Sequence, residues 1–401
     1  MRLGSMNFAQ RLSYLQSNVF GEMDRAKATA QREIIDLSLG SSDLPAPPLA
    51  VAKLHQALDD PATHGYLLFE GTAPFRMAVA QWVERKFGIS VDPQTEVLPL
   101  SGSQEGTALM PLALLDPGNY ALLLDPGYPS HAGGVHLAGG QIHTLKLQTP
   151  DFLPDFSNIP PKVLNKSKML VLSYPHNPTT GTATLEFFKE AVAFCQKNGL
   201  TLVHDFPYAD IAFGGYKPPS IFDADPEKSV SLEFYTMSKS YHMGGFRIGY
   251  AVGNPTLIKA LRQIRDVTNF YPYRGILQAA AQALSGPQDY VTESVQVFQE
   301  RRDACVEALA DIDWYIPAPK ATMYLWAKLP KSYTGSSMDF CRDLVRETGV
   351  ALAPGSGFGA SGEDYVRFAL VHPPDVLRKA VEAIGEFLSP HPRPLSRRRG
   401  E

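Results

Sequence analysis

Cysteine is scarce in this chain of 401 residues, which has only Cys195, Cys305 and Cys341. The three are widely spaced and odd in number, so they make neither a disulfide framework nor a familiar set of metal ligands. A chain without structural disulfides is typical of a reducing compartment. The sequence therefore predicts no disulfide-stabilised fold and favours the cytoplasm.

Long hydrophobic runs and an excess of one charge are absent as well. The most apolar stretch, Ala108–Leu115, is far shorter than the roughly 18 residues of a membrane span. The first twenty residues lack the apolar centre of a signal peptide. A net charge of −4 gives no reason to expect nucleic acid or an anionic membrane as partner. We therefore expect a soluble, cytoplasmic protein whose partners include neither.

Short apolar runs alternate with segments of helical length between about residues 49 and 284. The expected strands are Tyr120–Leu124, Met169–Tyr174, Thr201–Asp205, Val230–Thr236 and Ile248–Val252, and the expected helices include Gln104–Leu115, Leu185–Asn198 and Thr256–Val267. Strands that alternate with helices in this way predict an α/β fold with a mainly parallel sheet covered on both faces.

The two ends of the chain follow other patterns. Met6–Thr29 has the pattern of a helical arm, and a short strand at Ile34–Leu39 leads into a proline-rich linker. After Gly286 come a long helix, a strand, a second helix and a strand, expected at Tyr290–Ala310, Met323–Leu329, Met338–Thr348 and Tyr365–Leu370. We therefore predict an arm with part of a small domain (1–48), a large domain (49–285), a small α+β domain (286–388) and a disordered tail (389–401).

The segment Thr236–Tyr250 carries the most informative pattern. Hydroxyl side chains end a predicted strand, Lys239 follows, and a loop with glycines leads to Arg247 eight residues after the lysine. A lysine amine can form an imine with an aldehyde, and hydroxyls with an arginine can hold a phosphate. Arginine suits a phosphate because its planar fork donates two hydrogen bonds and stays charged.

At this segment the chain resembles the class I/II, fold-type I aminotransferases that depend on pyridoxal 5′-phosphate (PLP). The resemblance runs over roughly residues 30–385. The overall sequence pattern resembles that of the aspartate, alanine and LL-diaminopimelate aminotransferases. It implies the fold of the PLP-dependent transferases of type I, with a seven-stranded type of large sheet. It further implies that Lys239 holds the cofactor as a Schiff base, and that Thr236, Ser238 and Arg247 bind its phosphate.

Two further segments resemble the family's cofactor-binding loops. Ser101–Gln104 follows a predicted strand and opens a helix, whose N-terminal N–H groups suit a phosphate. The resemblance places Gly102, Ser103 and Gln104 at the cofactor, although several relatives have lysine at the position of Gln104. In Asp125–Ser130, Tyr128 matches the aromatic residue that stacks on the cofactor ring.

The segments around Asn177 and Asp205 also fall in the family's order. Asn177, in a stretch resembling Asn-Pro-Thr-Gly with one extra threonine, matches the residue that contacts the cofactor's phenolic oxygen and the substrate, and the bond to Pro178 is expected to be cis. Asp205 would pair with the pyridine nitrogen and keep it protonated, so that the ring accepts electrons from a substrate carbanion. Tyr208 would join Asn177 at the phenolic oxygen.

The remaining matches concern the substrate and a second subunit. Arg367 matches the arginine that grips the α-carboxylate of the substrate in a bidentate pair. Gly40 matches a position where the backbone approaches the substrate. Tyr66 matches a tyrosine that reaches the phosphate of the neighbouring subunit, so the resemblance implies a homodimer with shared active sites.

Two further patterns could suggest a dinucleotide site or a metal site, but neither fits. The loop Gly357–Gly362 fits G-x-G-x-x-G, but a strand follows it instead of a helix, so we interpret it as a substrate-side loop and not as a dinucleotide site. His131, His136 and His143 have a spacing that suits no common metal site, so no metal is expected.

The resemblance implies transfer of an amino group between an amino acid and a 2-oxo acid by a ping-pong route. Candidate donors are LL-diaminopimelate, aspartate, alanine and glutamate, with 2-oxoglutarate as one acceptor, and Arg265 and Arg274 are candidates for binding a distal carboxylate. A PLP-dependent carbon–sulfur β-lyase would share the same cofactor apparatus and remains an alternative. A non-catalytic ligand-sensing domain is a second one.

Overall fold

The computed structural model describes residues 8–15 and 19–389, which form two lobes. The larger lobe is built on an eight-stranded sheet of order β2-β9-β8-β7-β6-β3-β4-β5. The strands are β2 (Val97–Leu100), β3 (Tyr120–Asp125), β4 (Gln141–Gln148), β5 (Leu153–Pro154), β6 (Ser167–Leu172), β7 (Thr201–Asp205), β8 (Ser231–Thr236) and β9 (Gly249–Gly253).

Most neighbouring strands of this sheet are parallel. The pairs β4–β3, β3–β6, β6–β7 and β7–β8 are parallel, whereas β9 runs antiparallel to both β8 and β2, and β5 is antiparallel to β4. The predicted α/β fold with a mainly parallel sheet is therefore confirmed. The sheet has one strand more than expected, because the two-residue β5 extends its edge.

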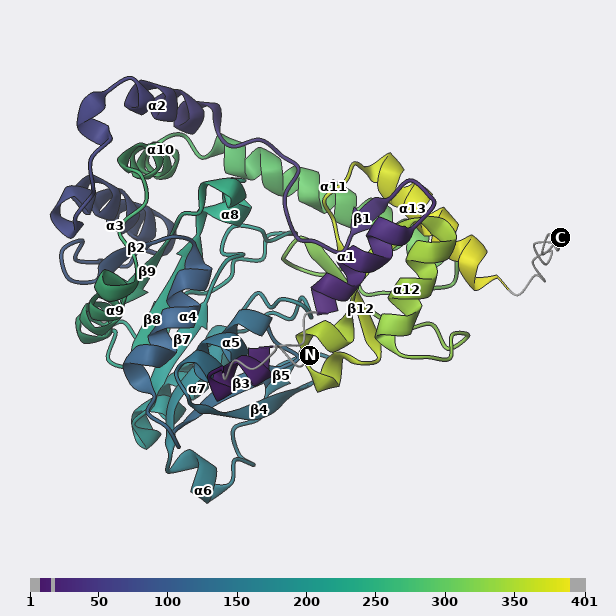
Figure 1. Cartoon of the computed structure of the whole chain (residues 1–401), viewed down its shortest axis with the longest axis horizontal. Coiled ribbons are helices and arrows are strands. Elements are labelled where there is room, and N and C mark those ends of the chain that lie inside the picture. Colours follow the sequence, from purple (N-terminus) through teal and green to yellow (C-terminus); the bar gives the residue numbers. More distant parts are fainter. Residues whose placement is uncertain (1–7, 16–18, 390–401) are drawn as a thin grey trace.

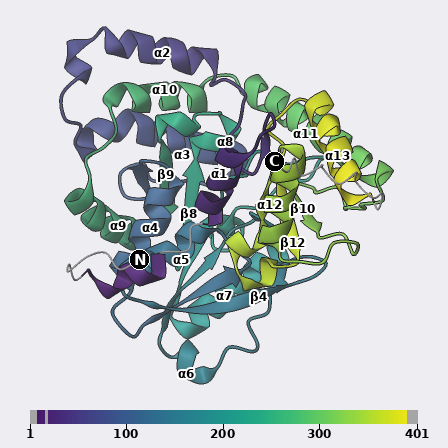
Figure 2. The ribbon, with the colours of Figure 1, turned by 45° about the vertical axis from the view of Figure 1, so that its right-hand side comes forward.

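Helices cover the large sheet and connect its strands. They are α2 (Pro48–Leu58), α3 (Ala73–Phe87), α4 (Ser103–Leu114), α5 (Pro129–Leu137), α6 (Pro161–Leu164), α7 (Leu185–Asn198), α8 (Met237–Ser240), α9 (Pro255–Thr268) and α10 (Arg274–Ser285). Helices α2 and α10 lie side by side in both ribbon views and pack on each other (Figures 1 and 2).

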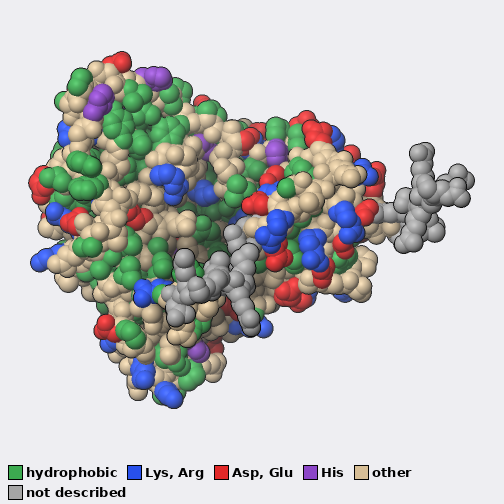
Figure 3. All heavy atoms as spheres, in the orientation of Figure 1, with side chains coloured by type: hydrophobic (Ala, Val, Ile, Leu, Met, Phe, Trp, Pro, Cys, Tyr) green, Lys and Arg blue, Asp and Glu red, His purple; other side chains and the backbone are tan. Residues whose placement is uncertain are grey.

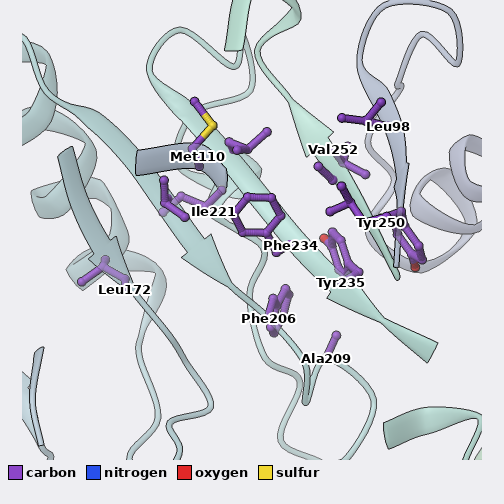
Figure 4. Packing of buried hydrophobic residues seen from close by; sticks show 14 of the residues in the cluster. Leu98, Met110, Leu172, Phe206, Ala209, Ile221, Phe234, Tyr235, Tyr250 and Val252 are labelled. Atoms are coloured by element: carbon purple, nitrogen blue, oxygen red, sulfur yellow. The ribbon is translucent and has the colours of Figure 1, made fainter. Parts of the chain in front are cut away.

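The core of the large lobe is continuous from α3 to β9. Aromatic rings such as Phe206, Phe234, Tyr235 and Tyr250 lie on and beside the central strands, as Figure 4 shows, and all are almost completely buried. Burial of such side chains contributes about 1.5–3 kcal/mol each relative to exposure. This packing fixes the carboxyl ends of the strands, where the chain turns toward the smaller lobe.

The smaller lobe has its own four-stranded sheet, of order β1-β11-β12-β10. Its elements are α1 (Val19–Thr29), β1 (Ile35–Leu37), α11 (Asp289–Asp311), β10 (Tyr324–Lys328), α12 (Ser337–Thr348), β11 (Val350–Pro354), β12 (Tyr365–Ala369) and α13 (Pro374–Leu388). Strand β1 pairs parallel with β11, so a segment from the start of the chain completes this sheet. The long helix α11 runs from the large lobe along the small one (Figure 1).

The described parts of the N-terminal arm are helical, as predicted, but they differ in type. Gln10–Leu15 forms a 3-10 helix, and α1 spans Val19–Thr29. The 3-10 helix lies against α5, where Tyr14 stacks on His136, but it buries none of its own residues. Residues 1–7, 16–18 and 390–401 lie outside the described part of the chain, and with them nearly all of the predicted tail. No described helix is long and apolar enough to cross a membrane.

A buried carboxylate ties the central strands together below the carboxyl edge. Glu233 on β8 is completely buried and accepts hydrogen bonds from His204 on β7, from the Ser220 hydroxyl and the Ile221 amide, and from the Tyr235 hydroxyl. Because His204 precedes Asp205, this network also fixes the end of β7. Its donors would be left unpaired in a dry environment without the carboxylate.

Replacing Glu233 by alanine is therefore expected to lower the free energy of unfolding by about 3 kcal/mol or more, as for other broken buried charge networks. Denaturant unfolding followed by circular dichroism measures this change. Glu227→Ala, on the exposed side of the preceding loop, is the matched control and should change stability by less than about 0.5 kcal/mol. Equal effects of the two changes would contradict the role given to the network.

Candidate functional site

A cavity of about 500 Å³ lies at the carboxyl edge of the large sheet, between the two lobes. Parallel strands end at the same edge of a sheet, which is why segments far apart in the sequence meet there. The predicted residues that line the cavity are Gly40, Ser103, Gln104, Tyr128, Asn177, Asp205, Tyr208, Thr236, Ser238, Lys239, Arg247 and Arg367. Gly102 lies directly beside it, whereas Tyr66 lies elsewhere on the surface.

One end of the cavity is suited to an anion. Helix α4 begins at Ser103, so its first N–H groups have no partners within the helix. The guanidinium of Arg247 lies over Gly102 and donates to the carbonyl oxygens of Ser101 and Gly244 at 3.3 and 3.0 Å. A Cβ on Gly102 would lie 2.5 Å from Arg247 Nη2, and its φ is +89°, so this position requires glycine.

The hydroxyls beside Lys239 extend this anion-binding end. Thr236 accepts a hydrogen bond from the Ser238 amide at 3.1 Å and donates to the Ser238 hydroxyl at 2.9 Å. Both side chains line the cavity together with Arg247. The group therefore combines a fixed positive charge with hydroxyl donors, the arrangement that binds a phosphate.

Asp205 is the buried carboxylate of the cavity. Its Oδ2 pairs with His131 Nε2 at 3.1 Å, while its Oδ1 has no hydrogen-bond partner among the described residues. A buried carboxylate oxygen without a donor is costly, because it has lost its water. Asp205 can thus accept a hydrogen bond from a protonated group that enters the cavity.

Lys239 lies at the centre of the cavity, just after β8. Its Nζ donates to the carbonyl oxygen of Gly40 at 2.6 Å and lies 6.0 Å from the centre of the Tyr208 ring. The segment Leu39–Ser42 therefore crosses the cavity in contact with the lysine. We refer to Leu39–Ser42 as the strap.

Arg367, in β12, faces the cavity from the small lobe. It is 3% exposed and donates to Asn177 Oδ1 at 2.8 Å and to the Ser38 carbonyl at 2.9 Å, while its Nε has no partner in the described part of the chain. The ring of Tyr324 lies 4.1 Å from its guanidinium carbon and that of Phe358 lies 4.7 Å away. Aromatic faces hold the cation in a fixed plane, where it can bind a carboxylate.

Some expectations need correction or stay predictions. The loop Gly357–Gly362 does not line the cavity; Phe358 supports Arg367 and Ser361 donates to Asp125 at the lobe boundary. The bond Asn177–Pro178 is cis, as predicted. Arg265 and Arg274 do not line the cavity of their own chain, so a contact with a distal carboxylate remains a prediction for a second subunit.

Several cavity residues had no role in the sequence prediction. They are Leu39, Ser41, Ser42, Ser173, Pro207, His242, Gly244, Gly245 and Tyr324, together with His131 behind Asp205. Burial lowers the pKa of His242 to about 4, so this side chain is neutral at neutral pH. His242, Gly244 and Gly245 lie within the segment Thr236–Tyr250, but the pattern assigned them no role. No short motif marks the strap or Tyr324, because the strap and β10 approach the cavity only through the packing of the two lobes.

Comparison with known proteins gives a consistent result. The family described as Aminotransferase class I and II matches residues 32–384. A protein of Dehalococcoides mccartyi named LL-diaminopimelate aminotransferase is 42% identical over 96% of this chain and 100% of its own length.

Solved structures agree with this match. Substrate-bound BacF of Bacillus subtilis has a TM-score of 0.92 at 32% identity, covering 96% of this chain and 99% of its own. A probable N-succinyldiaminopimelate aminotransferase of Thermus thermophilus has a TM-score of 0.87 at 39% identity, covering 92% of this chain and 100% of its own.

Proposed function

This chain belongs to the class I and II aminotransferases, and from that membership we propose that it uses pyridoxal 5′-phosphate to exchange an amino group between LL-diaminopimelate and a 2-oxo acid. That it is an aminotransferase follows from the family match over residues 32–384. The choice of substrate is carried by the relative named LL-diaminopimelate aminotransferase, which is 42% identical over its full length.

The residues of the cavity fit this cofactor. The unpartnered Oδ1 of Asp205 would accept a hydrogen bond from the protonated pyridine nitrogen, and Arg247, Thr236, Ser238 and the start of α4 would hold the phosphate. Tyr128 lines the same cavity and supplies a ring for stacking. When bound, the cofactor draws electrons away from the bond that breaks at the substrate α-carbon.

Arg367 would bind the α-carboxylate of the substrate. Its guanidinium now donates to Asn177 and to the Ser38 carbonyl, so a carboxylate would meet a donor group already oriented by neighbours. Asn177 and Tyr208 would hold the phenolic oxygen of the cofactor. Because the arginine fork binds a carboxylate in one plane, it also fixes the direction of the α-carbon toward Lys239.

Lys239 would act as general base and remove the proton from the substrate α-carbon. It would then act as general acid and deliver the proton to the C4′ carbon of the cofactor. Its flexible stem and the nearby Gly40 carbonyl allow the amine to be held close to either position. Glutamate and 2-oxoglutarate are proposed as the second substrate pair. In this scheme the chain's own contribution is to bind, orient and transfer the proton.

The far end of the substrate would meet polar but uncharged groups of this chain. Ser41, Ser42 and the amide of Gln104 line the cavity, and its remaining cationic side chains, Lys239 and Arg247, are used for other roles. Hydroxyls and an amide can bind both the distal amino and the distal carboxylate group of a diamino dicarboxylic acid.

A homodimer is part of the proposal. Tyr66, Leu68, Val267 and Phe270 are 81, 62, 88 and 56% exposed, and the rings of Tyr66 and Phe270 are 4.7 Å apart. Figure 3 shows many hydrophobic side chains, with fewer charged ones between them, on this face of the large lobe, and clusters of both charges on the small lobe. A second copy covering these residues would bury apolar surface and bring Tyr66 to the partner's cavity.

The experiment that tests the function is a half-reaction with single amino acids and no 2-oxo acid. We expect LL-diaminopimelate to convert the visible band of the bound cofactor at least about tenfold faster than aspartate or alanine does. Faster reaction with N-succinyl-LL-diaminopimelate would favour the second candidate, the activity named for the Thermus relative. Release of both ammonia and pyruvate from an amino acid with sulfur on its β-carbon would indicate a carbon–sulfur lyase, and no cofactor band after addition of PLP would refute the proposal.

A further inference from the structure

Tyr324 is a buried tyrosine of the cavity that the motifs do not mark. It opens β10, is 2% exposed and lies on the small-lobe side of the cavity. Its hydroxyl accepts a hydrogen bond from the Tyr208 hydroxyl at 3.1 Å. The two rings meet edge to face, with centroids 5.8 Å apart.

The strap passes directly over the same hydroxyl. A Cβ on Gly40 would lie 1.9 Å from the Tyr324 hydroxyl oxygen, so only glycine lets the strap run this close. The carbonyl of Gly40 accepts from Lys239 Nζ at 2.6 Å, and the positive charge of Lys239 acts on the Tyr324 hydroxyl. The lysine amine is thus held by the strap, which itself lies against the Tyr324 hydroxyl.

The positive charges around Tyr324 favour its hydroxyl oxygen as a hydrogen-bond acceptor. Burial favours the neutral phenol, but the positive charges of Lys239 and Arg367, together with the hydrogen bond from Tyr208, outweigh it and lower the pKa of Tyr324. The pKa values of Tyr208 and Tyr128 are raised instead, chiefly by burial. Tyr324 therefore differs in character from the other two tyrosines of the cavity.

We propose that Tyr324 is a positioning residue for the amino-group transfer: its hydroxyl accepts from Tyr208 and supports the strap that holds Lys239, and so sets where the amine lies and stabilises a positive charge there. The inference rests on the proposed role of Lys239. The guanidinium of Arg367 lies over the ring face of Tyr324, and this contact remains when only the hydroxyl is removed. Removal of the hydroxyl alone therefore separates the two roles.

Tyr324→Phe keeps the ring and removes the acceptor. A cationic nitrogen at Lys239 then loses stabilisation, and Tyr208 is freed to donate to the cofactor oxygen; both effects favour the deprotonated form. We expect the pH midpoint of the visible cofactor band to fall by about one unit, a change within the range of a lost charge contact. We expect kcat to fall about tenfold through misplacement of the amine, with KM changed less than about threefold.

The test uses the holoenzyme of wild type, Tyr324→Phe and a control, Tyr333→Phe. Tyr333 is a tyrosine of the same lobe whose hydroxyl donates to Asp343 at 3.0 Å, far from the motifs of the site. Its variant should leave the midpoint and kcat per bound cofactor at the wild-type values. A midpoint within about 0.2 units of wild type in Tyr324→Phe, or an upward shift, would overturn the inference.

Gly40→Ala, alone and combined with Tyr324→Phe, gives a second test of the role of the hydroxyl. If Tyr324→Phe does not fold, Gly40→Ala displaces the same hydroxyl and should lower the midpoint in the same direction. Where both fold, Gly40→Ala should shift the midpoint less in the Tyr324→Phe background than in wild type, and equal shifts would contradict an effect through the hydroxyl. A wild-type enzyme without a cofactor band would refute the proposed function itself, independently of Tyr324.

Discussion

Replacing Lys239 by alanine is expected to lower turnover to less than about one ten-thousandth of the wild-type rate, because in the proposed mechanism one side chain would supply both the covalent attachment and the general base. The amine is the one lysine nitrogen that lines the cavity among the described residues, so no neighbour can replace it. Steady-state kinetics with the best amino donor from the half-reaction measures the loss.

A covalent readout separates chemistry from folding. Borohydride treatment of the wild-type holoenzyme should fix the cofactor to the peptide that contains Lys239, as detected by mass spectrometry, and should give no such product with Lys239→Ala. Lys259→Ala removes an exposed lysine of α9 and serves as the control with unchanged rate and labelling. Near-native activity of Lys239→Ala, or labelling at another lysine, would contradict the assignment.

The parts of the site that the sequence predicts share one property. Asp205, Asn177 and Lys239 each follow a short apolar run that becomes a strand of the large sheet, at β7, β6 and β8. Parallel strands bring their carboxyl ends together, so local patterns were enough to place these residues at one cavity. Strand β7 and helix α7 even have the bounds expected from the sequence.

The parts that the sequence did not predict depend on contacts between distant segments. Tyr324 is an ordinary aromatic residue of a strand until the strap crosses it, and the strap is placed by the ion pair of Asp43 with Arg301 on α11, at 2.7 Å. His131 was considered only as a metal ligand and excluded. Its contact with Asp205 joins residues 74 positions apart, and no local pattern reports it.

The N-terminal arm shows the limit of periodicity. Its pattern predicted a helical arm without the type of each helix, and the Gln10–Leu15 segment, although it lies against α5, buries no side chain. Helix α1, in contrast, packs on α12 and β11 and buries Met23. Burial of side chains therefore distinguishes the α-helical segment from the 3-10 helix.

The second large effect is expected for Asp205→Asn, which keeps the size of the side chain and removes its charge. In the proposed mechanism the unpartnered Oδ1 would accept from a protonated ring nitrogen, and a neutral amide would stabilise that positive charge far less. We expect kcat to fall by about 10²–10³, comparable to other losses of preorganised electrostatic stabilisation, with a smaller change in KM.

Asp225→Asn is the matched control for this prediction. Asp225 is buried to a similar degree, but its carboxylate accepts from the loop at Ser229–Ser231 and lies outside the cavity. We expect this variant to lose thermal stability while kcat per bound cofactor stays within about twofold of wild type. Asp205→Asn should show the reverse, since the amide oxygen can still accept from His131 and the carboxylate Oδ1 has no donor to lose in the described part of the chain. If both variants lost thermal stability and kept the kcat of wild type, Asp205 would be a structural carboxylate. The electron-withdrawing role of the cofactor would then have to be supported by another group.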